Sequence, residues 1–187
     1  MASVVPFSEI QEEFDETFGY VRQDIQAVLK SDLRLHYTLA LLTCCACEML
    51  SWHKGHRNPH AIFVELLPRT PHHQQTGRTL WEALRNGLAH RFRPDTIQID
   101  TTSWRFSISS GAEPIIGCRL GDPLWIQINI RRFSSLVIER IDAYEQELRT
   151  SAEACSKFKE LSEKTTKVIS NEAANVREGL NAIGAGT

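Results

Sequence analysis

Hydrophobic side chains recur at every third or fourth position along most of this chain, which is the spacing of amphipathic helices. The first stripe predicts a helix over about residues 8–30, whose other face is acidic. The next segment, about 32–52, is apolar on most sides, so we expect this helix in the middle of a bundle. A short helix ends near Leu67. A fourth is predicted from residues 76–79 and must end before Pro94, because the residue preceding a proline disfavours helical angles.

The pattern changes after Pro94. The segments TIQID, SWRFSIS and LWIQINI alternate apolar and polar residues and favour β-branched and aromatic types, which predicts strands. The intervening residues 109–123 contain three glycines and are predicted to form turns. Helical spacing resumes at about residue 131, continues to about 149, and persists more weakly to about 170.

These elements predict a mainly α fold. We expect one domain over residues 1–170, a helical bundle with a small antiparallel sheet of two or three strands inserted at about residues 95–130, after the fourth helix. Residues 171–187 are predicted to form a flexible C-terminal tail. The length of 187 residues suits a single well-buried core.

Charge and cysteine content indicate which partners and which cellular compartment to expect. The net charge of −2 gives no global reason for nucleic-acid binding, so such a partner must meet a local patch. The N-terminus lacks a basic region followed by an apolar run, and charged residues interrupt the densest apolar stretch, Leu33–Trp52. We therefore expect a cytoplasmic protein without a membrane span. Three of five cysteines, Cys44, Cys45 and Cys47, lie in that apolar stretch, which predicts free, buried thiols.

The chemistry is concentrated in the predicted fourth helix, at Arg85-Asn86-Gly87-Leu88-Ala89-His90. The planar guanidinium of arginine fits a phosphate, histidine exchanges protons near neutral pH, and the asparagine amide both donates and accepts hydrogen bonds. Together these groups suit cleavage of a phosphodiester without a metal ion. The surrounding residues 69–93 hold five arginines and one acid, Glu82, a net of +4.

Helical geometry limits how these side chains converge. Asn86 and His90 are four residues apart and share a face, whereas Arg85 and His90 are five apart, about 140° around an ideal helix. Two arrangements would bring them together. In one, the helix ends near Gly87–His90, with the glycine allowing departure from helical angles. In the other, two copies of the chain face each other across a shared cleft, and the two arrangements are compatible.

This motif, late in a bundle helix, preceded by a long apolar helix and followed by a strand-rich insertion, resembles the HEPN superfamily over about residues 8–150. The resemblance implies a dimeric, metal-independent endoribonuclease of a prokaryotic toxin–antitoxin or phage-defence type that needs no cofactor. Arg85 would bind and polarise the scissile phosphate, Asn86 would orient it, and His90 would be the general acid or base. The 2′-hydroxyl of RNA would attack and leave a 2′,3′-cyclic phosphate. The implied partners are RNA, a second copy, and an antitoxin or another partner protein.

Five further residues are expected to contact substrate phosphates: Arg78, Arg91, Arg93, His72 and His73. Other interpretations stay open. The chain is alternatively a non-catalytic HEPN-like module that binds RNA, a nucleotide or a protein, or a purely structural dimerisation domain. Trp104 and Phe106 are candidates for base stacking or for the core. The residues that suggest a zinc site instead are His53, His56, His60 and Cys47.

Overall fold

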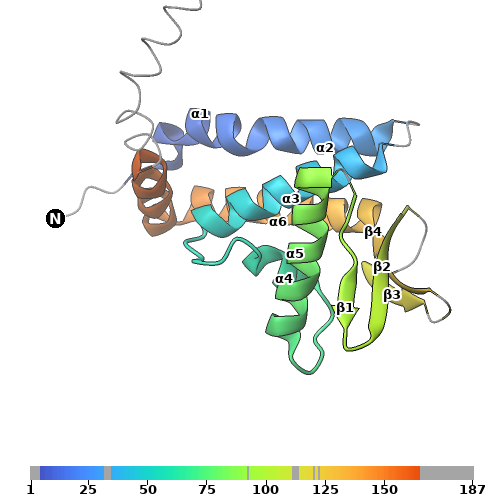
Figure 1. Ribbon diagram of the computed structural model, residues 1–187. Coiled ribbons are helices and arrows are strands. Elements are labelled where there is room, and N and C mark those ends of the chain that lie inside the picture. The colour runs from blue at the N-terminus through green and yellow to red at the C-terminus, as the bar shows by residue number, and fades with distance from the viewer. Residues whose placement is uncertain are drawn as a thin grey trace, which may run out of the picture.

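The computed structural model describes residues 5–31, 35–91, 93–110, 114–119, 121 and 123–164. In Figure 1 a group of packed helices lies beside a small sheet. The elements in chain order are a 3-10 turn (Phe7–Glu9), α1 (Gln11–Phe14), a π-helical turn (Asp15–Gly19), α2 (Tyr20–Lys30), α3 (His36–His53), α4 (Ala61–Leu66), α5 (His73–Arg91), β1 (Ile97–Ile99), β2 (Thr102–Ser109), β3 (Ile116–Arg119), β4 (Leu124–Asn129) and α6 (Ile130–Thr150). Residues 152–164 are also helical. The predicted mainly α class is confirmed.

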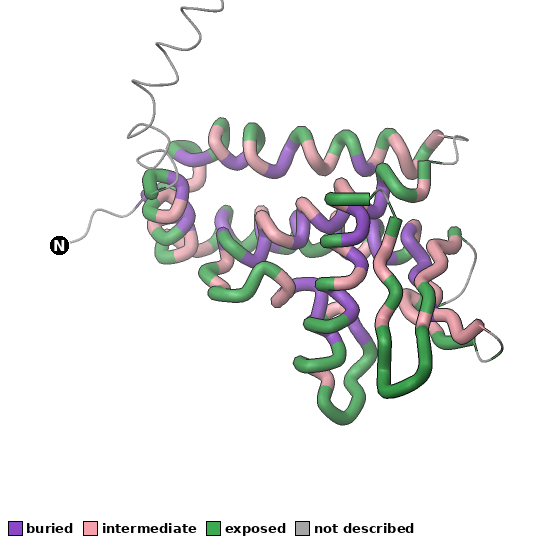
Figure 2. The backbone as a smooth tube through the Cα atoms, in the orientation of Figure 1, coloured by how far each residue is buried: buried purple, intermediate pink, exposed green. Residues whose placement is uncertain are grey.

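The first hydrophobic stripe forms one long rod, because α1, the π-helical turn and α2 follow one another without a break. The stripe residues Phe14, Phe18 and Ile25 are fully buried. Phe14 and Phe18 lie on either side of the start of the π turn, with their ring centres 5.2 Å apart. Figure 2 shows that the buried positions of this rod lie on the side facing the other helices, while its outer side is exposed.

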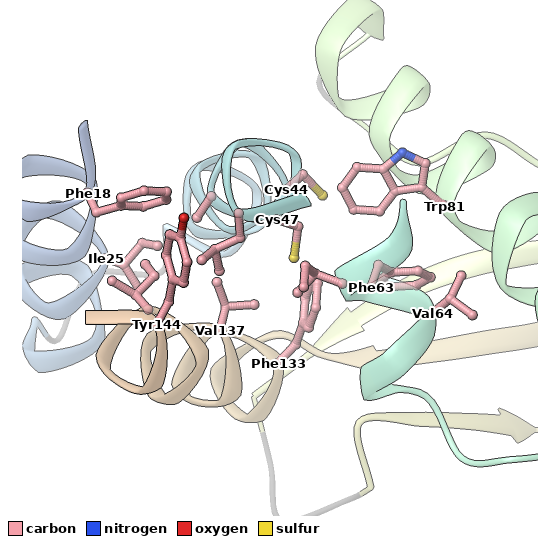
Figure 3. Close-up of a cluster of buried hydrophobic side chains, with 14 of the residues drawn as sticks. Phe18, Ile25, Cys44, Cys47, Phe63, Val64, Trp81, Phe133, Val137 and Tyr144 are labelled. Atoms are coloured by element: carbon pink, nitrogen blue, oxygen red, sulfur yellow. The ribbon is translucent and has the colours of Figure 1, made fainter. Parts of the chain in front are cut away.

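α3 is the central helix and contacts α2, α4, α5 and α6. Its buried polar side chain, Thr43, is satisfied: the hydroxyl lies 2.7 Å from the Leu39 carbonyl and 2.6 Å from Ser134 Oγ on α6. Figure 3 shows Cys44 and Cys47 among the apolar side chains that line this centre. Both thiols are free, and burial raises the pKa of Cys47, so the prediction of buried free cysteines holds for this pair. Cys45 is also free but only half-buried, so the prediction of a buried thiol is wrong there.

The sheet differs from the predicted antiparallel one. It has four strands in the order β1-β2-β4-β3, and β2 and β4 run parallel. Residues 109–123, expected to be turns, contain β3, which pairs antiparallel with β4. The prediction failed because Gly117 was interpreted as a turn residue, although it lies opposite Gln127 within the ladder. β3 lies at the edge of the sheet, and the chain turns back from it into β4, which lies between β3 and β2. β2 and β4 are therefore parallel neighbours without a helical crossover between them.

α6 follows β4 directly and closes the bundle. The Asn129 side chain accepts a hydrogen bond of 3.1 Å from the Arg132 amide and so caps the helix. The α6 residues that face the core are Phe133, Val137, Ile141, Tyr144 and Leu148. Beyond Ser151 the helix at 152–164 buries Cys155 and Phe158 against the same core. The end of the predicted weak helix, 165–170, and the predicted tail, 171–187, lie outside the described residues.

Candidate functional site

The motif lies on α5, which is an unbroken helix from His73 to Arg91. Gly87 keeps its helical conformation, so the hypothesis that this glycine lets the chain depart from helical angles is wrong, although the helix does end at Arg91, one residue beyond His90. Gly87 serves a different purpose: after α5 the chain folds back against it, with Arg93 N donating to Gly87 O at 3.3 Å and Asp95 N to Ala83 O at 2.9 Å. A Cβ on Gly87 would lie 2.4 Å from Arg93 O and from Asp95 N, so only glycine allows this approach.

Arg85 is anchored to the central helix. Its Nε donates to Glu48 Oε1 at 2.8 Å and its Nη2 to Glu48 Oε2 at 3.2 Å, which is a bidentate ion pair between α5 and α3. The hydrogen bond to Glu48 raises the pKa of Arg85. Because 32% of the arginine and 28% of the glutamate side chain stay exposed, the pair lies at the rim of the core rather than inside it. Sequence reasoning missed Glu48, since nothing in the sequence indicates which acid faces Arg85.

A cavity of about 760 Å³ opens beside this ion pair. Arg78, Arg85 and Asn86 of α5 line it, facing Glu48 and the loop residue His60. The structure thus brings together three of the predicted site residues. The positive charge of the two arginines is locally compensated, because Arg78 Nε donates to Glu82 Oε1 at 2.7 Å and Arg85 pairs with Glu48. Among the described residues His90 is not part of this lining.

His90 lies one turn further along α5 and is exposed to solvent. Since α5 is continuous, Arg85 and His90 leave the helix about 140° apart. Arg91 and Arg93 lie at this end of α5 and line a second cavity of about 430 Å³. Arg105 of β2 lines the same cavity, and sequence reasoning missed it. The alternation in SWRFSIS predicted its strand, but not that the strand's side chain would meet the end of α5.

The predicted contacts His72 and His73 lie at the opposite end of α5. His73 starts the helix, and its Nδ1 lies 3.1 Å from Pro68 O. His72 precedes it in a left-handed conformation, with φ at 57°. At 1.5 Å rise per residue, His73 is roughly 25 Å along the axis from His90. The structure therefore does not bring this histidine pair to the His90 end of the motif.

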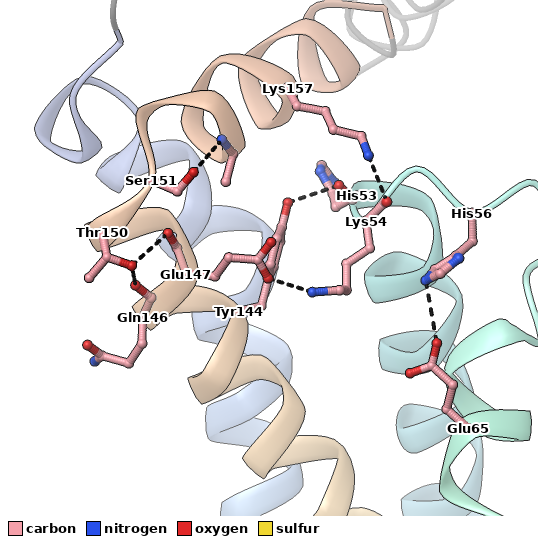
Figure 4. A network of polar contacts seen from close by, with 11 residues as sticks. His53, Lys54, His56, Glu65, Tyr144, Gln146, Glu147, Thr150, Ser151 and Lys157 are labelled. Atoms are coloured by element: carbon pink, nitrogen blue, oxygen red, sulfur yellow. Dashed lines mark hydrogen bonds and ion pairs between the residues drawn. The ribbon is translucent and has the colours of Figure 1, made fainter.

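The candidate zinc ligands do not converge. The described residues contain no group of three or more His, Cys, Asp or Glu side chains placed to hold a metal ion. His53 stacks on Phe158 with ring centres 4.7 Å apart, and its carbonyl accepts the Tyr144 hydroxyl at 2.9 Å (Figure 4). His56 instead lies 3.7 Å from Glu65, and His60 lines the cavity beside Arg85.

The buried imidazole of His53 predicts a pH-dependent stability. Burial lowers its pKa to about 4 from the ordinary 6.5, so between these values the unfolded chain binds a proton that the folded chain does not. Stability must then fall as the pH decreases through this window and is unaffected by this group above it. We expect urea midpoints to report a loss of about 2 kcal/mol between pH 7 and pH 5 from this residue. The variant His53→Phe keeps the ring stack and should lack that component; equal pH profiles would contradict the assignment.

No family model matches this chain, and neither the curated proteins nor the solved structures contain a significant match to it. Within the described parts of the chain, no helix has both the length and the apolar character that a membrane span requires.

Proposed function

We propose that this protein is a HEPN-like, metal-independent endoribonuclease of a prokaryotic defence or toxin–antitoxin type that acts as a homodimer. The observation that supports this best is the accessibility of the motif. Asn86 and His90 are exposed along α5, and Arg85, although anchored, keeps part of its guanidinium at the surface of an open cavity. A polynucleotide can therefore reach all three side chains.

The chemistry assigned to these residues is an in-line transesterification. The 2′-oxygen of RNA forms a bond to phosphorus while the bond to the 5′-oxygen breaks, leaving a 2′,3′-cyclic phosphate. Arg85 binds the non-bridging oxygens, where negative charge builds up in the transition state. Asn86 donates a hydrogen bond that orients the phosphate, and the His90 imidazole takes the 2′-proton or supplies one to the departing 5′-oxygen.

A second copy is part of the proposal, because Arg85 and His90 of one chain leave α5 in different directions. Two copies related by a two-fold axis near the C-terminal half of α5 would place the arginine of one beside the histidine of the other. Homodimers of this symmetry are the most common oligomers. An antitoxin would then act by covering this face or by separating the copies.

Mixing two inactive variants tests the shared site. Arg85→Ala and His90→Ala are each expected to lack RNA cleavage. After they are unfolded together and refolded at equal amounts, cleavage should return to about a quarter of the wild-type rate, because half the dimers are hybrids and each hybrid keeps one complete Arg85–His90 combination of two. Recovery that is absent in the mixture, with both variants folded and dimeric, would contradict a site shared between copies.

A non-catalytic RNA-binding module is the second candidate, and the Arg85–Glu48 ion pair favours it. An arginine already bonded bidentately to a carboxylate offers less charge to a phosphate than a free one. In this case Arg85 mainly holds α5 against α3, and RNA binds elsewhere on the same face.

The variant Glu48→Gln separates the two candidates. Removing the carboxylate charge is expected to cost about 1 kcal/mol of stability, as for a partly exposed ion pair. If Arg85 binds the scissile phosphate, the freed guanidinium should bind RNA several-fold more tightly; if Arg85 is structural, RNA affinity should not change. Thermal melts and fluorescence anisotropy with a labelled oligoribonucleotide measure the two effects, and the exposed Glu139→Gln on α6 is the control.

A further inference from the structure

We propose that the cavity at the C-terminal end of α5, the arginine cavity, holds one nucleotide of a single-stranded RNA, with its phosphate on the arginines and its base on the aromatic side chains. The residues that carry this inference are Arg91, Arg93, Arg105, Tyr37 and Trp125. The inference rests on the proposed function, because it adds a substrate contact next to His90. The volume of about 430 Å³ lies within the usual range of small-molecule pockets.

The cations of this cavity are largely uncompensated, unlike those near Arg85. Neither Arg93 nor Arg105 forms an ion pair with a carboxylate of the described residues. The one acid in the lining, Asp95, lies 3.2 Å from Arg91 Nη1 and so offsets one of the three guanidiniums. An excess of positive charge in a concave site favours a phosphate, which arginine binds through two parallel hydrogen bonds.

Aromatic side chains complete the cavity. Arg105 of β2 is directly paired with Trp125 of β4, so the two side chains stand next to each other on one face of the sheet. Tyr37, in the first turn of α3, is 50% exposed and supplies a second ring. An unpaired base stacks on such rings independently of its identity, while a base inside a duplex is not available for stacking. The combination of guanidiniums and rings therefore fits single-stranded RNA.

The position of the cavity connects it to the proposed chemistry. Arg91 directly follows His90 in the sequence, and the segment Arg93–Asp95 is fixed against α5 by its hydrogen bonds to Ala83 and Gly87. A nucleotide held here would neighbour the phosphate that His90 acts on. The β insertion thus has a role in substrate binding, because β2 and β4 contribute Arg105 and Trp125 to the same cavity as the segment that follows α5.

Fluorescence anisotropy with a 5′-fluorescein-labelled decauridylate tests the inference. The full chain carries His90→Asn, so that the probe is not cut. Adding Arg105→Gln should weaken binding about tenfold and lower the slope of log affinity against log salt by about 0.7. Trp125→Ala should also weaken binding about tenfold, and Trp125→Phe should restore it. The control Arg140→Gln removes an exposed cation of α6 and should leave binding unchanged.

Melting curves establish that each variant is folded, and the exposed Tyr37→Ala replaces Trp125→Ala if the latter is unstable. Unchanged affinity in Arg105→Gln overturns the inference. So does a loss limited to Arg105→Gln while Trp125→Ala and Tyr37→Ala bind normally, because that pattern describes a phosphate patch without a base site. Weakened binding in these variants, combined with a wild-type chain that does not cleave RNA, would support the cavity and contradict the endoribonuclease. Cleavage that depends on His90 but not on Arg105 would support the endoribonuclease and contradict the arginine cavity as a substrate site.

Discussion

Replacing His90 with asparagine is expected to slow RNA cleavage by about 100-fold or more, because general acid–base catalysis usually contributes factors of this size. Asparagine keeps a polar side chain of similar size but does not exchange a proton near neutral pH. His90 is exposed near the end of α5, so the free energy of unfolding should stay close to that of the wild type. Single-turnover cleavage of a labelled oligoribonucleotide, with a thermal melt on the same sample, measures both quantities.

The matched control is His72→Asn at the other end of α5. His72 has a φ of 57°, a conformation that asparagine tolerates well, so this substitution removes an imidazole without straining the backbone. Cleavage in this control should be unchanged, since the structure separates His72 from His90 along the helix. If His90→Asn cleaves RNA as fast as the control does, the catalytic assignment fails and the binding module takes its place.

The helices were predictable because their stripes are local. Every residue in the α6 stripe, from Phe133 to Leu148, is a large apolar side chain three or four positions from the next, so the sequence alone places it on one face. α3 was recognisable as central for the related reason that it lacks a polar face. The sheet was not predictable in this way, because the parallel pairing of β2 with β4 depends on where β3 lies. β3 contains Gly117, which in the sequence indicates a turn rather than a strand.

The candidate site was predictable only in part. The motif on α5 follows from residue types and spacing, but Glu48 is 37 residues from Arg85 in the chain, and no local pattern connects them. Arg105 likewise reaches the end of α5 only through the tertiary arrangement of the sheet. The role of Gly87 was interpreted wrongly for the same reason: its lack of a side chain provides room for a later segment instead of ending its own helix.

Gly87→Ala is expected to be among the most destabilising single-methyl additions in this chain. The new Cβ would lie 2.4 Å from two backbone atoms, Arg93 O and Asp95 N, which cannot rotate away as a side chain does. Either the segment 93–95 must lift off α5 and lose its hydrogen bonds to Ala83 and Gly87, or the end of α5 must distort. We expect a loss of about 3 kcal/mol, or a fall in Tm of roughly 6–12 °C for a chain of this length.

Substitutions at two other glycines are controls that distinguish this clash from the general effect of adding a methyl group. Gly19 has helical angles, and its Cβ would meet Asp15 at an ordinary 3.6 Å, so Gly19→Ala should be neutral or stabilising by up to about 1 kcal/mol. A Cβ added to Gly117 would meet no atom within 4 Å beyond the adjacent residues of the chain, so alanine should be tolerated. Equal melting temperatures for Gly87→Ala and Gly19→Ala would contradict the close approach. Segment 93–95 also lines the arginine cavity. Gly87→Ala should therefore weaken RNA binding even at temperatures where the protein stays folded. Gly19→Ala and Gly117→Ala should bind RNA normally.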